Sequence, residues 1–557
     1  MSPKPRPLAL HPKQSSRRSF LTLTALTAAG VPVVAGCRLS RAGSGGGGGA
    51  GSSGAASPAP DGWQDLDGHL LGHRVSVRVS PLVRVSEEAT ALVLELTRAA
   101  DDAAVADVQS SESGSDDSDN TVYASTSLGR PLPARGASGV RLIDTAGAGR
   151  VWTAGSASGG TLELKPGETV SSTVVFTPVD LDEVTVLVPQ TGFVRVRVID
   201  RDAAADVGVS SEALGKADKI IQDNSGPGDK AAVVPLERYT RALDDSTGTR
   251  TTDKDVTVTL ASDVTFDSDS YNLTAAADAQ LQTVADQIAQ YPDGGNLDIV
   301  GHTDDVADNA HNQTLSENRA GAVKDRLGQL TDLAKWQVTA TGKGETEPAI
   351  NDTTDEARAA NRRVVITITP TSGTTSSAPP PSATSTPDNN LPDAQGPVGT
   401  GPDGVTVPGP DGKGQITITL DHVTRNGGLL TAQLTITTGP GGTDDATLTT
   451  WLKDPAQAFA SSRGENGGAS AVGIANGLTL LADGQRLYPT DYLPPDSTWH
   501  HPLTELYTYK PLKEGATTTI CVAWPDTAQD TLTLDHPPTK NSNQYAYRLT
   551  NIPVITA

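Results

Sequence analysis

Two long stretches of this chain alternate apolar and polar residues with a period of two, and this pattern constrains the fold more than any other feature. The alternation runs from Trp63 to Ile199 and again from Gln415 to Val554. Successive side chains of a strand point to opposite faces of a sheet, so this period, together with many β-branched residues, indicates half-buried strands. We therefore predict an antiparallel β-sandwich over residues 62–204 and a second one over residues 412–557.

The two β regions also share a short order of motifs. A strand-like run from Gly139 to Asp144 precedes Leu164-Lys165-Pro166-Gly167, and a similar run from Gly477 to Leu481 precedes Leu512-Lys513-Glu514-Gly515. This order resembles the small immunoglobulin-like modules of exported Gram-positive lipoproteins. Because such an order also arises in unrelated sandwiches, a duplication stays one of two open interpretations. We expect both β regions to fold independently of the segment between them.

The segment from 253 to 370 has a different pattern, in which strands alternate with helices. Its four predicted strands cover 256–260, 297–300, 337–341 and 364–368. A first helix is expected from Ala275 to Gln290, with Thr274 as its N-cap and Pro292 ending it. A second helix is expected from about Leu315 to Leu327, because Thr314 and Glu317 have the spacing of a capping box. The order predicts a central α+β domain of βαβαβ type.

A carboxylate and a guanidinium should meet at one rim of this central sheet. Asp304 follows the second predicted strand, and Arg319 lies in the first turns of the second predicted helix. An anion can hold an ammonium group, and the planar fork of an arginine can hold a carboxylate. The pair therefore suits a zwitterionic ligand.

Five motifs in this segment appear in a fixed order. They are F-D-x-D-S-x-x-L from Phe266, G-H-T-D from Gly301, N-x-x-L-S-x-x-R-A from Asn312, G-x-G-E-x-x-P from Gly342, and R-A-x-N-R-R-V from Arg358. In this order they resemble the peptidoglycan-binding domain of the OmpA C-terminal family. The resemblance covers about a fifth of the chain.

The resemblance implies a ligand and a set of residues that bind it. The ligand of the family is the diaminopimelate of the peptidoglycan stem peptide, whose side chain ends in an amine and a carboxylate. The positions that match the family are Thr303, Asp304, Asn312 and Arg319, with Asp269 at the polar position of the first motif. Arg362 and Arg363 match the N-R-R motif, and we expect them at the edge of the site or supporting Asp304.

Other interpretations of the same residues remain open. A lone Asp–Arg pair can be a surface salt bridge, which is worth about 0 to 1 kcal/mol. Asp305 is acidic where many relatives are neutral, so it could strengthen the attraction of an ammonium group or disturb the loop. His302, His311 and the nearby aspartates could suggest a metal, although they meet no zinc or calcium spacing.

We predict no catalytic residues, no metal and no cofactor. The alternatives are a scaffold that binds an envelope protein through its β regions and a metal-dependent cell-wall hydrolase.

The N-terminus resembles an export signal. Arg17-Arg18 precede an apolar run, and Val34-Ala35-Gly36-Cys37 looks like a lipobox, so residues 1–36 are predicted to be a twin-arginine signal peptide and Cys37 the lipidated residue. Stable anchoring needs two acyl chains. The predicted location is the extracytoplasmic face of the cell membrane, with the protein anchored by lipid and associated with the cell wall.

Three further segments connect these parts. Residues 37–61 are a Gly/Ser-rich tether, and residues 371–411 are a linker rich in Ser, Thr and Pro. Residues 205–252 are expected to be a connector with a short helix at about 236–243. The formal charge of −23 makes nucleic acid a poor partner. Cys521 lies in an apolar run, which predicts a buried structural thiol.

Overall fold

The computed structural model describes most of the chain after residue 58. The described residues are 59–70, 72–102, 122–123, 136–145, 149–228, 230–374, 391–409, 412–443, 447–453, 475–495, 497–504, 512–538 and 543–556. The predicted signal peptide, Cys37 and most of both predicted linkers lie outside them. Within the described residues, no helix has both the length and the apolar character needed to cross a bilayer.

The first β region contains the predicted period-two strands. Its strands are β1 (Gln64–Leu70), β2 (His73–Val79), β3 (Leu82–Ser86), β4 (Ala89–Arg98), β5 (Val122–Tyr123), β6 (Arg141–Ile143), β7 (Arg150–Thr153), β8 (Ser156–Ala157), β9 (Glu163–Leu164), β10 (Thr169–Phe176), β11 (Glu183–Val188) and β12 (Gly192–Asp200). The sheet order is β1-β2-β4-β3-β12-β11-β6-β7-β13. Alternate residues of β2 are buried, which is the pattern of a strand with one face on the core. The immunoglobulin-like assignment stays a prediction.

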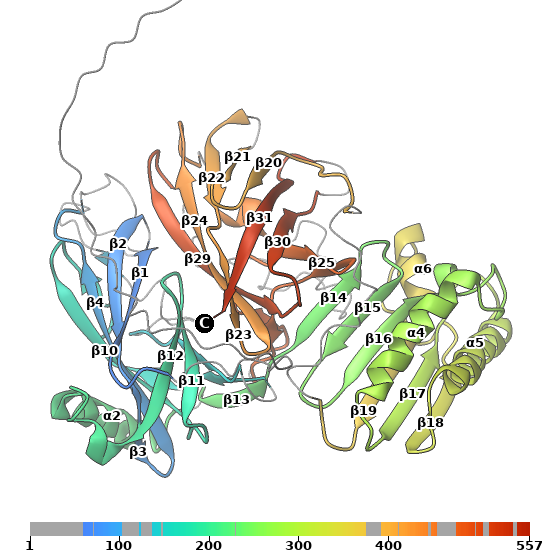
Figure 1. The fold of residues 1–557 in the computed structure, drawn as a ribbon, viewed down its shortest axis with the longest axis horizontal. Coiled ribbons are helices and arrows are strands. Elements are labelled where there is room, and N and C mark those ends of the chain that lie inside the picture. Colours follow the sequence, from blue (N-terminus) through green and yellow to red (C-terminus); the bar gives the residue numbers. More distant parts are fainter. Residues whose placement is uncertain are drawn as a thin grey trace, which may run out of the picture. The chain divides into compact units, whose positions relative to one another are not determined.

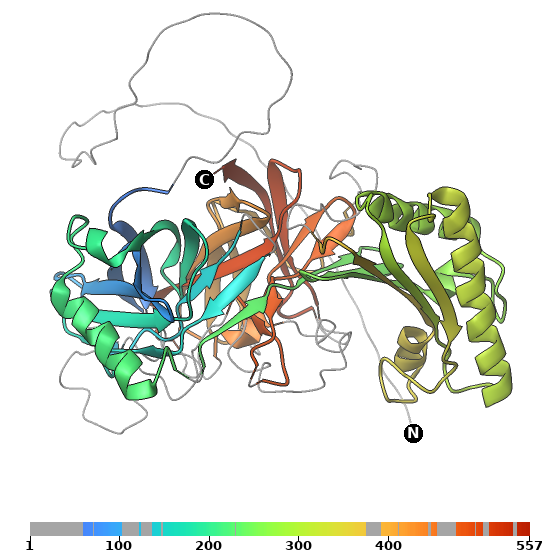
Figure 2. The same cartoon turned by 90° about the horizontal axis from the view of Figure 1, so that it is seen from below.

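The segment predicted to be a connector has regular structure of its own. It contains α2 (Ser211–Asn224), β13 (Ala232–Pro235), β14 (Arg238–Ala242) and β15 (Thr247–Thr251). Helix α2 follows its N-cap Ser210 and lies against the first β region (Figure 2). Its buried side chains belong to an apolar cluster with β3 and β4. The helix expected at 236–243 is wrong. Strand β14 occupies this position because β15 and β26 (Gln485–Leu487) supply its hydrogen-bond partners.

The central region has the predicted alternation of strands and helices. Its elements are β16 (Val256–Ala261), α3 (Ser262–Thr265), α4 (Ala275–Ala289), β17 (Gly295–Gly301), α5 (Asn309–Leu330), β18 (Trp336–Gly342), α6 (Asp355–Asn361) and β19 (Arg363–Pro370). The strand order is β18-β17-β19-β16, in which only the β17–β18 pair is parallel. Apolar side chains of α4 and α5 pack on one face of this sheet (Figure 1). The mixed α/β architecture predicted for this segment is confirmed.

The two main helices of this region differ in how well their starts were predicted. Helix α4 begins after Thr274, whose side chain accepts a hydrogen bond from the Ala277 N–H, as expected. Helix α5 begins at Asn309, so the predicted start near Thr314 is wrong. The side chain of Asp308 caps it by accepting from the N–H groups of Ala310 and His311. Arg319 therefore lies in the third turn of α5.

The last β region is built around an apolar core, and most of its strand pairs are antiparallel. The prediction of a wholly antiparallel sandwich is wrong here, because β31 pairs in parallel with both β20 and β23. Its elements are β20 (Val398–Thr400), β21 (Val405–Pro408), β22 (Gln415–Thr419), β23 (Val423–Asn426), β24 (Leu429–Thr438), α7 (Thr449–Leu452), β25 (Thr479–Ala482), β26 (Gln485–Leu487), β27 (Asp491–Tyr492), β28 (His501–Pro502), β29 (Thr517–Pro525), β30 (Thr531–His536) and β31 (Tyr547–Thr556). Trp451 and Trp524 are fully buried in this core. Cys521 is a free, buried cysteine, as predicted.

The two β regions share buried contacts. One apolar cluster combines Ile143, Leu187 and Val234 with Leu429, Cys521 and Ala523. In the same cluster the Tyr492 hydroxyl accepts a hydrogen bond of 2.7 Å from Arg141 Nε. The described part of the chain after Ala56 belongs to one compact unit. A shared core argues against the expectation that the β regions fold independently.

Candidate functional site

A pocket of about 810 Å³ lies in the central region beyond the end of β17. It is lined by α3, the loop from Phe266 to Asp269, the loop after β17, the first three turns of α5 and the residue after α6. All six residues predicted from the sequence line this pocket, namely Asp269, Thr303, Asp304, Asn312, Arg319 and Arg362. The structure therefore brings the predicted residues together, while their binding role stays a prediction.

Asp304 is held in the pocket by an arginine from another element. Its Oδ2 accepts a hydrogen bond of 2.8 Å from Arg362 Nη1, and its Oδ1 accepts one of 3.3 Å from the Val306 N–H. Arg362 also donates two hydrogen bonds, of 2.7 and 2.5 Å, to the carboxylate of Asp263. These bonds raise the pKa of Arg362 and lower the pKa of Asp263. The expectation that Arg362 supports Asp304 agrees with this geometry.

Arg319 is not the ion-pair partner of Asp304, although both line the pocket. Its side chain is buried, with 4% exposed, and its Nε donates a hydrogen bond of 2.9 Å to the Ser270 carbonyl. The guanidinium carbon lies 5.1 Å from the centre of the Phe266 ring, which fixes the plane of the group. No described residue forms an ion pair with Arg319, and burial lowers the pKa of its guanidinium. Arg319 is thus a buried cation whose nearby carboxylates, Asp263, Asp269 and Asp304, act on it only electrostatically.

Asn312 and Thr303 line the pocket and make hydrogen bonds that position the loop after β17. The Asn312 amide is 2% exposed and donates to the carbonyls of Asp304 and Ala307, both at 3.1 Å, and to Glu345 Oε2 at 2.6 Å. The Thr303 hydroxyl donates to the Asp304 carbonyl. The sequence prediction missed Glu345, although it belongs to the G-x-G-E motif. Asn312 therefore acts through the backbone of Asp304.

Asp269 has a histidine partner that the sequence prediction considered only as a metal ligand. Its backbone is left-handed, with φ of 49°, which aspartate tolerates better than most residues. Its Oδ1 lies 2.9 Å from His311 Nε2, and both residues line the pocket. Within the described residues, no three His, Cys, Asp or Glu side chains are grouped so that they could hold a metal ion.

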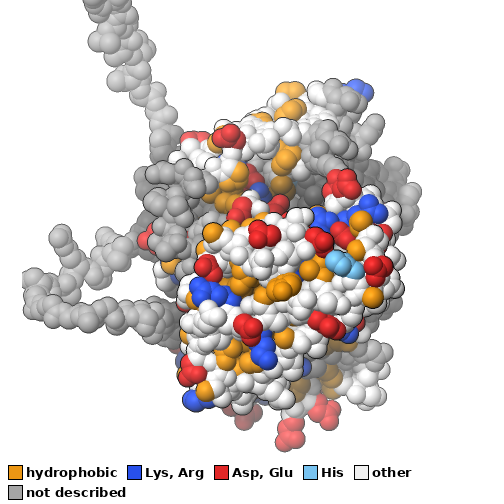
Figure 3. All heavy atoms as spheres, turned by 90° about the vertical axis from the view of Figure 1, so that its right-hand side faces the viewer, with side chains coloured by type: hydrophobic (Ala, Val, Ile, Leu, Met, Phe, Trp, Pro, Cys, Tyr) orange, Lys and Arg blue, Asp and Glu red, His pale blue; other side chains and the backbone are white. Residues whose placement is uncertain are grey.

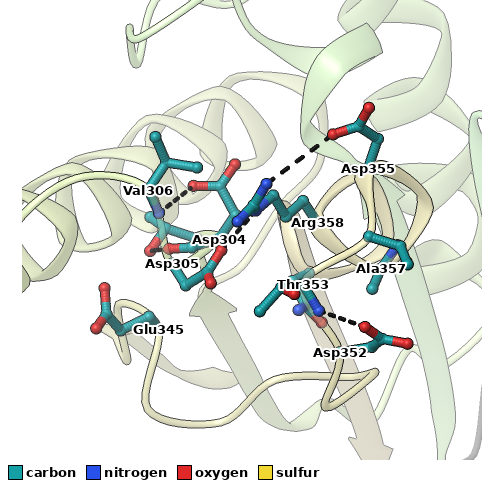
Figure 4. Close-up of polar contacts among 12 residues, drawn as sticks. Asp304, Asp305, Val306, Glu345, Asp352, Thr353, Asp355, Ala357 and Arg358 are labelled. Carbon is teal, nitrogen blue, oxygen red and sulfur yellow. Dashed lines mark hydrogen bonds and ion pairs between the residues drawn. The ribbon is translucent and has the colours of Figure 1, made fainter.

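Asp305, the acidic departure from the family pattern, turns away from the pocket. Its Oδ1 accepts a hydrogen bond of 2.7 Å from Arg358 Nε of helix α6, as Figure 4 shows. This bond lowers the pKa of the Asp305 carboxyl. Asp305 does not line the pocket. Its carboxylate instead connects the loop after β17 to helix α6 through Arg358.

His302, the histidine of the G-H-T-D motif, is buried and should make the domain sensitive to acid. Burial lowers its pKa from 6.5 to about 4. Because this pKa is depressed in the folded state, the unfolded state takes up more protons below pH 6.5, and stability falls from there to about pH 4. This difference between the pKa values of the unfolded and folded states corresponds to about 3 kcal/mol of stability.

In urea unfolding, His302→Phe should lose less stability than the wild type between pH 7 and about pH 4. The exposed His422→Gln should behave like the wild type, and an equal loss in all three proteins would contradict the assignment.

Comparison with known proteins identifies the domain that carries this pocket. Residues 265–362 match the OmpA family. The protein YfiB of Escherichia coli, which is named as a lipoprotein, is 30% identical over 110 residues, which are 20% of this chain and 68% of YfiB. The chain belongs to the OmpA family. Outer membrane porin F of Pseudomonas aeruginosa is 41% identical over 102 residues to this OmpA domain, which is 18% of the chain and 29% of the porin. The chain thus spans under a third of that porin.

Solved structures also resemble the OmpA domain. The cell wall anchor of the T6SS from Pseudomonas aeruginosa is 31% identical, and the match covers 21% of this chain and 82% of that chain with a TM-score of 0.19. The peptidoglycan-associated lipoprotein from Burkholderia pseudomallei is 29% identical, with coverage of 18% and 86% and a TM-score of 0.17.

Proposed function

We propose that this protein is a non-catalytic lipoprotein of the cell envelope that binds the diaminopimelate stem peptide of peptidoglycan and links the membrane to the wall. The OmpA domain, at residues 253–370, supplies the wall contact. Cys37 supplies the membrane contact through its lipid.

One observation carries the proposal: Arg319 is a buried guanidinium that has no carboxylate partner among the described residues. Arg362, in contrast, shares Asp263 and Asp304 in the same pocket. A buried cation without a counter-ion is costly, so a ligand that brings a carboxylate relieves this cost. Arg319 keeps both of its terminal nitrogens for such a group, because its hydrogen bond to the Ser270 carbonyl uses only Nε.

The second charge of the ligand fits the acidic side of the pocket. Asp304 and Asp269 both lie close enough to Arg319 to affect its pKa electrostatically. The side chain of diaminopimelate ends in an ammonium group and a carboxylate on one carbon atom. Its carboxylate would meet Arg319 while its ammonium group meets Asp304 and Asp269. A lysine side chain has the ammonium group but leaves Arg319 without an anion.

The membrane link rests on the lipobox and on relatives. YfiB and YiaD of Escherichia coli, which match the OmpA domain at 30% and 33% identity, are both named as lipoproteins. Replacing Cys37 by Ala should release the protein from the membrane fraction or leave it unprocessed, because no other residue accepts the lipid. Mass spectrometry of the mature N-terminus measures the outcome, and acylation that persists in the variant would refute the anchor.

Co-sedimentation with purified sacculi tests the proposed function. The protein should pellet with sacculi that contain diaminopimelate and stay in solution with sacculi that contain lysine at the same position. Chelation of metal should change neither result. Release of soluble muropeptides by the wild type would instead indicate a hydrolase, and equal pelleting with both kinds of sacculi would contradict recognition of the carboxylate.

A further inference from the structure

The pocket contains one histidine side chain among the charged groups that line it. Residues 253–370 contain two histidines, His302 and His311. Burial lowers the pKa of His302 to about 4, so it stays neutral between about pH 5 and 8. His311 is 44% exposed at the pocket and is the histidine that faces solvent.

His311 lies in the first turn of α5, and its side chain contacts Asp269 in the loop that follows α3. Asp308 Oδ1 accepts a hydrogen bond of 3.0 Å from the His311 N–H, which fixes the residue in the first turn of α5. The ring Nε2 lies 2.9 Å from Asp269 Oδ1. The next residue, Ser270, provides the carbonyl that accepts from Arg319 Nε. The contact between His311 and Asp269 therefore lies next to the hydrogen bond that positions Arg319, and both Asp269 and Arg319 are proposed to contact the ligand.

The charged groups around His311 come from every element that lines the pocket. Two carboxylates besides Asp269 line the same pocket from the loops, Asp267 and Asp304, and Asp308 caps the helix of His311. The cations of the pocket are Arg319 in α5 and Arg362 after α6, and Asp263 in α3 is bonded to Arg362. Aspartates and arginines ordinarily keep their charges between about pH 5 and 8. Figure 3 shows one face of the molecule on which a histidine side chain (pale blue) lies beside acidic side chains (red).

We propose that His311 is a specificity-determining residue of the pocket that competes with the ammonium group of the ligand for Asp269. This inference rests on the proposed function. A protonated imidazolium neutralises Asp269 and places a second positive charge where the ammonium group arrives. A neutral imidazole leaves the charge of Asp269 to the ligand. Binding of a peptide with a free amine should therefore tighten as His311 loses its proton.

The expected effect is moderate because the pair is exposed. The side chain of Asp269 is 71% exposed, so solvent screens the competition. We expect the affinity of the wild type to rise about threefold to fivefold between about pH 5.5 and about pH 8. The direction follows from repulsion between like charges at low pH.

Variants at position 311 separate this effect from a structural role. The probe is a soluble muropeptide whose stem peptide ends in diaminopimelate, and the readout is its dissociation constant at about pH 5.5 and about pH 8. His311→Gln should bind at both pH values about as tightly as the wild type does at the higher one. His311→Lys should bind weakly at both values, because its charge is permanent. The exposed histidine of the last β region serves as a control, and His422→Gln should keep the wild-type profile.

The outcomes are distinguishable from failure of the proposed function. If the wild type does not bind the muropeptide at either pH, the proposed function is wrong and the inference falls with it. If the wild type binds equally at both pH values, or if His311→Gln keeps the wild-type ratio, the proposed function stands and His311 has no part in specificity. Acetylation of the ligand's amine should remove the pH dependence, since the competing charge is then absent.

Discussion

Arg319→Ala should abolish co-sedimentation with diaminopimelate-type sacculi while leaving the fold intact. The variant removes the buried guanidinium and leaves the carboxylate of the ligand without a partner. Truncating one partner of such a charge pair costs about 2 to 5 kcal/mol, which is a loss of roughly thirtyfold or more in affinity. Asp304→Ala should have a similar effect, because the ammonium group loses its anion and Arg362 loses one of its two carboxylates.

Two further variants show whether the shape of the guanidinium matters. Arg319→Lys should rescue binding poorly, because an ammonium group cannot reproduce the two-donor fork. Arg326 lies on the same helix and pairs with Asp278 outside the pocket, so Arg326→Ala should bind like the wild type. Normal binding by Arg319→Ala and Asp304→Ala, with unchanged circular dichroism, would remove the site assignment.

Tyr492→Ala should destabilise the protein by about 3 to 5 kcal/mol. The ring is 1% exposed and belongs to the apolar cluster that the two β regions share. Its loss opens a cavity and removes the hydroxyl that accepts a hydrogen bond from Arg141 Nε. The free energy of unfolding in urea measures the effect.

Milder variants divide this effect into its parts. Tyr492→Phe keeps the ring and should cost about 1 to 2 kcal/mol, the value of the lost hydrogen bond. Val398→Ala, at a side chain that is 57% exposed, should change stability by less than about 0.5 kcal/mol. In a Cys37→Ser background, Tyr492→Ala should also speed the labelling of Cys521, which is 3% exposed in the same cluster. Stability and labelling equal to those of the wild type would mean that the two regions do not share a core.

The sequence predicted the central domain well because its signals are local. The apolar face of α4, its cap at Thr274 and its end before Pro292 are all contained in the helix itself. The start of α5 was mispredicted because Thr314 and Glu317 have capping-box spacing inside the helix. Only the structure shows that Asp308 is the cap, since the side chain must be seen to accept hydrogen bonds from the N–H groups that follow.

The residues of the pocket could be predicted, but their pairing could not. Family motifs place Asp304 and Arg319 together, and both line the pocket. Which arginine bonds to Asp304 depends on where the end of α6 places Arg362. The bond between Arg362 and Asp304 is a tertiary contact between residues 58 positions apart. Glu345 was missed, and His311 was considered only as a metal ligand, for the same reason: Asn312 and Asp269 reach them only after folding.

In the flanking regions, strands with a local sequence pattern could be predicted, and strands that depend on distant partners could not. Period-two alternation predicted strands such as β2, β11 and β12, because alternation of apolar and polar residues is a local signal. The alternation matches burial of one face in β2, whereas β11 is buried on both faces. The segment from 205 to 252 lacks this period, and β13 and β14 form because β7 and β26 provide their hydrogen-bond partners. The shared cluster around Tyr492 likewise joins residues from distant parts of the chain.

Calorimetric titration with two soluble muropeptides tests the central claim most directly. The two ligands are identical except that one stem peptide ends in diaminopimelate and the other in lysine, so they differ by the carboxylate that Arg319 should bind. The protein should bind the first and bind the second at least about thirtyfold more weakly. Equal affinity for the two ligands would contradict the claim that Arg319 recognises the carboxylate of diaminopimelate.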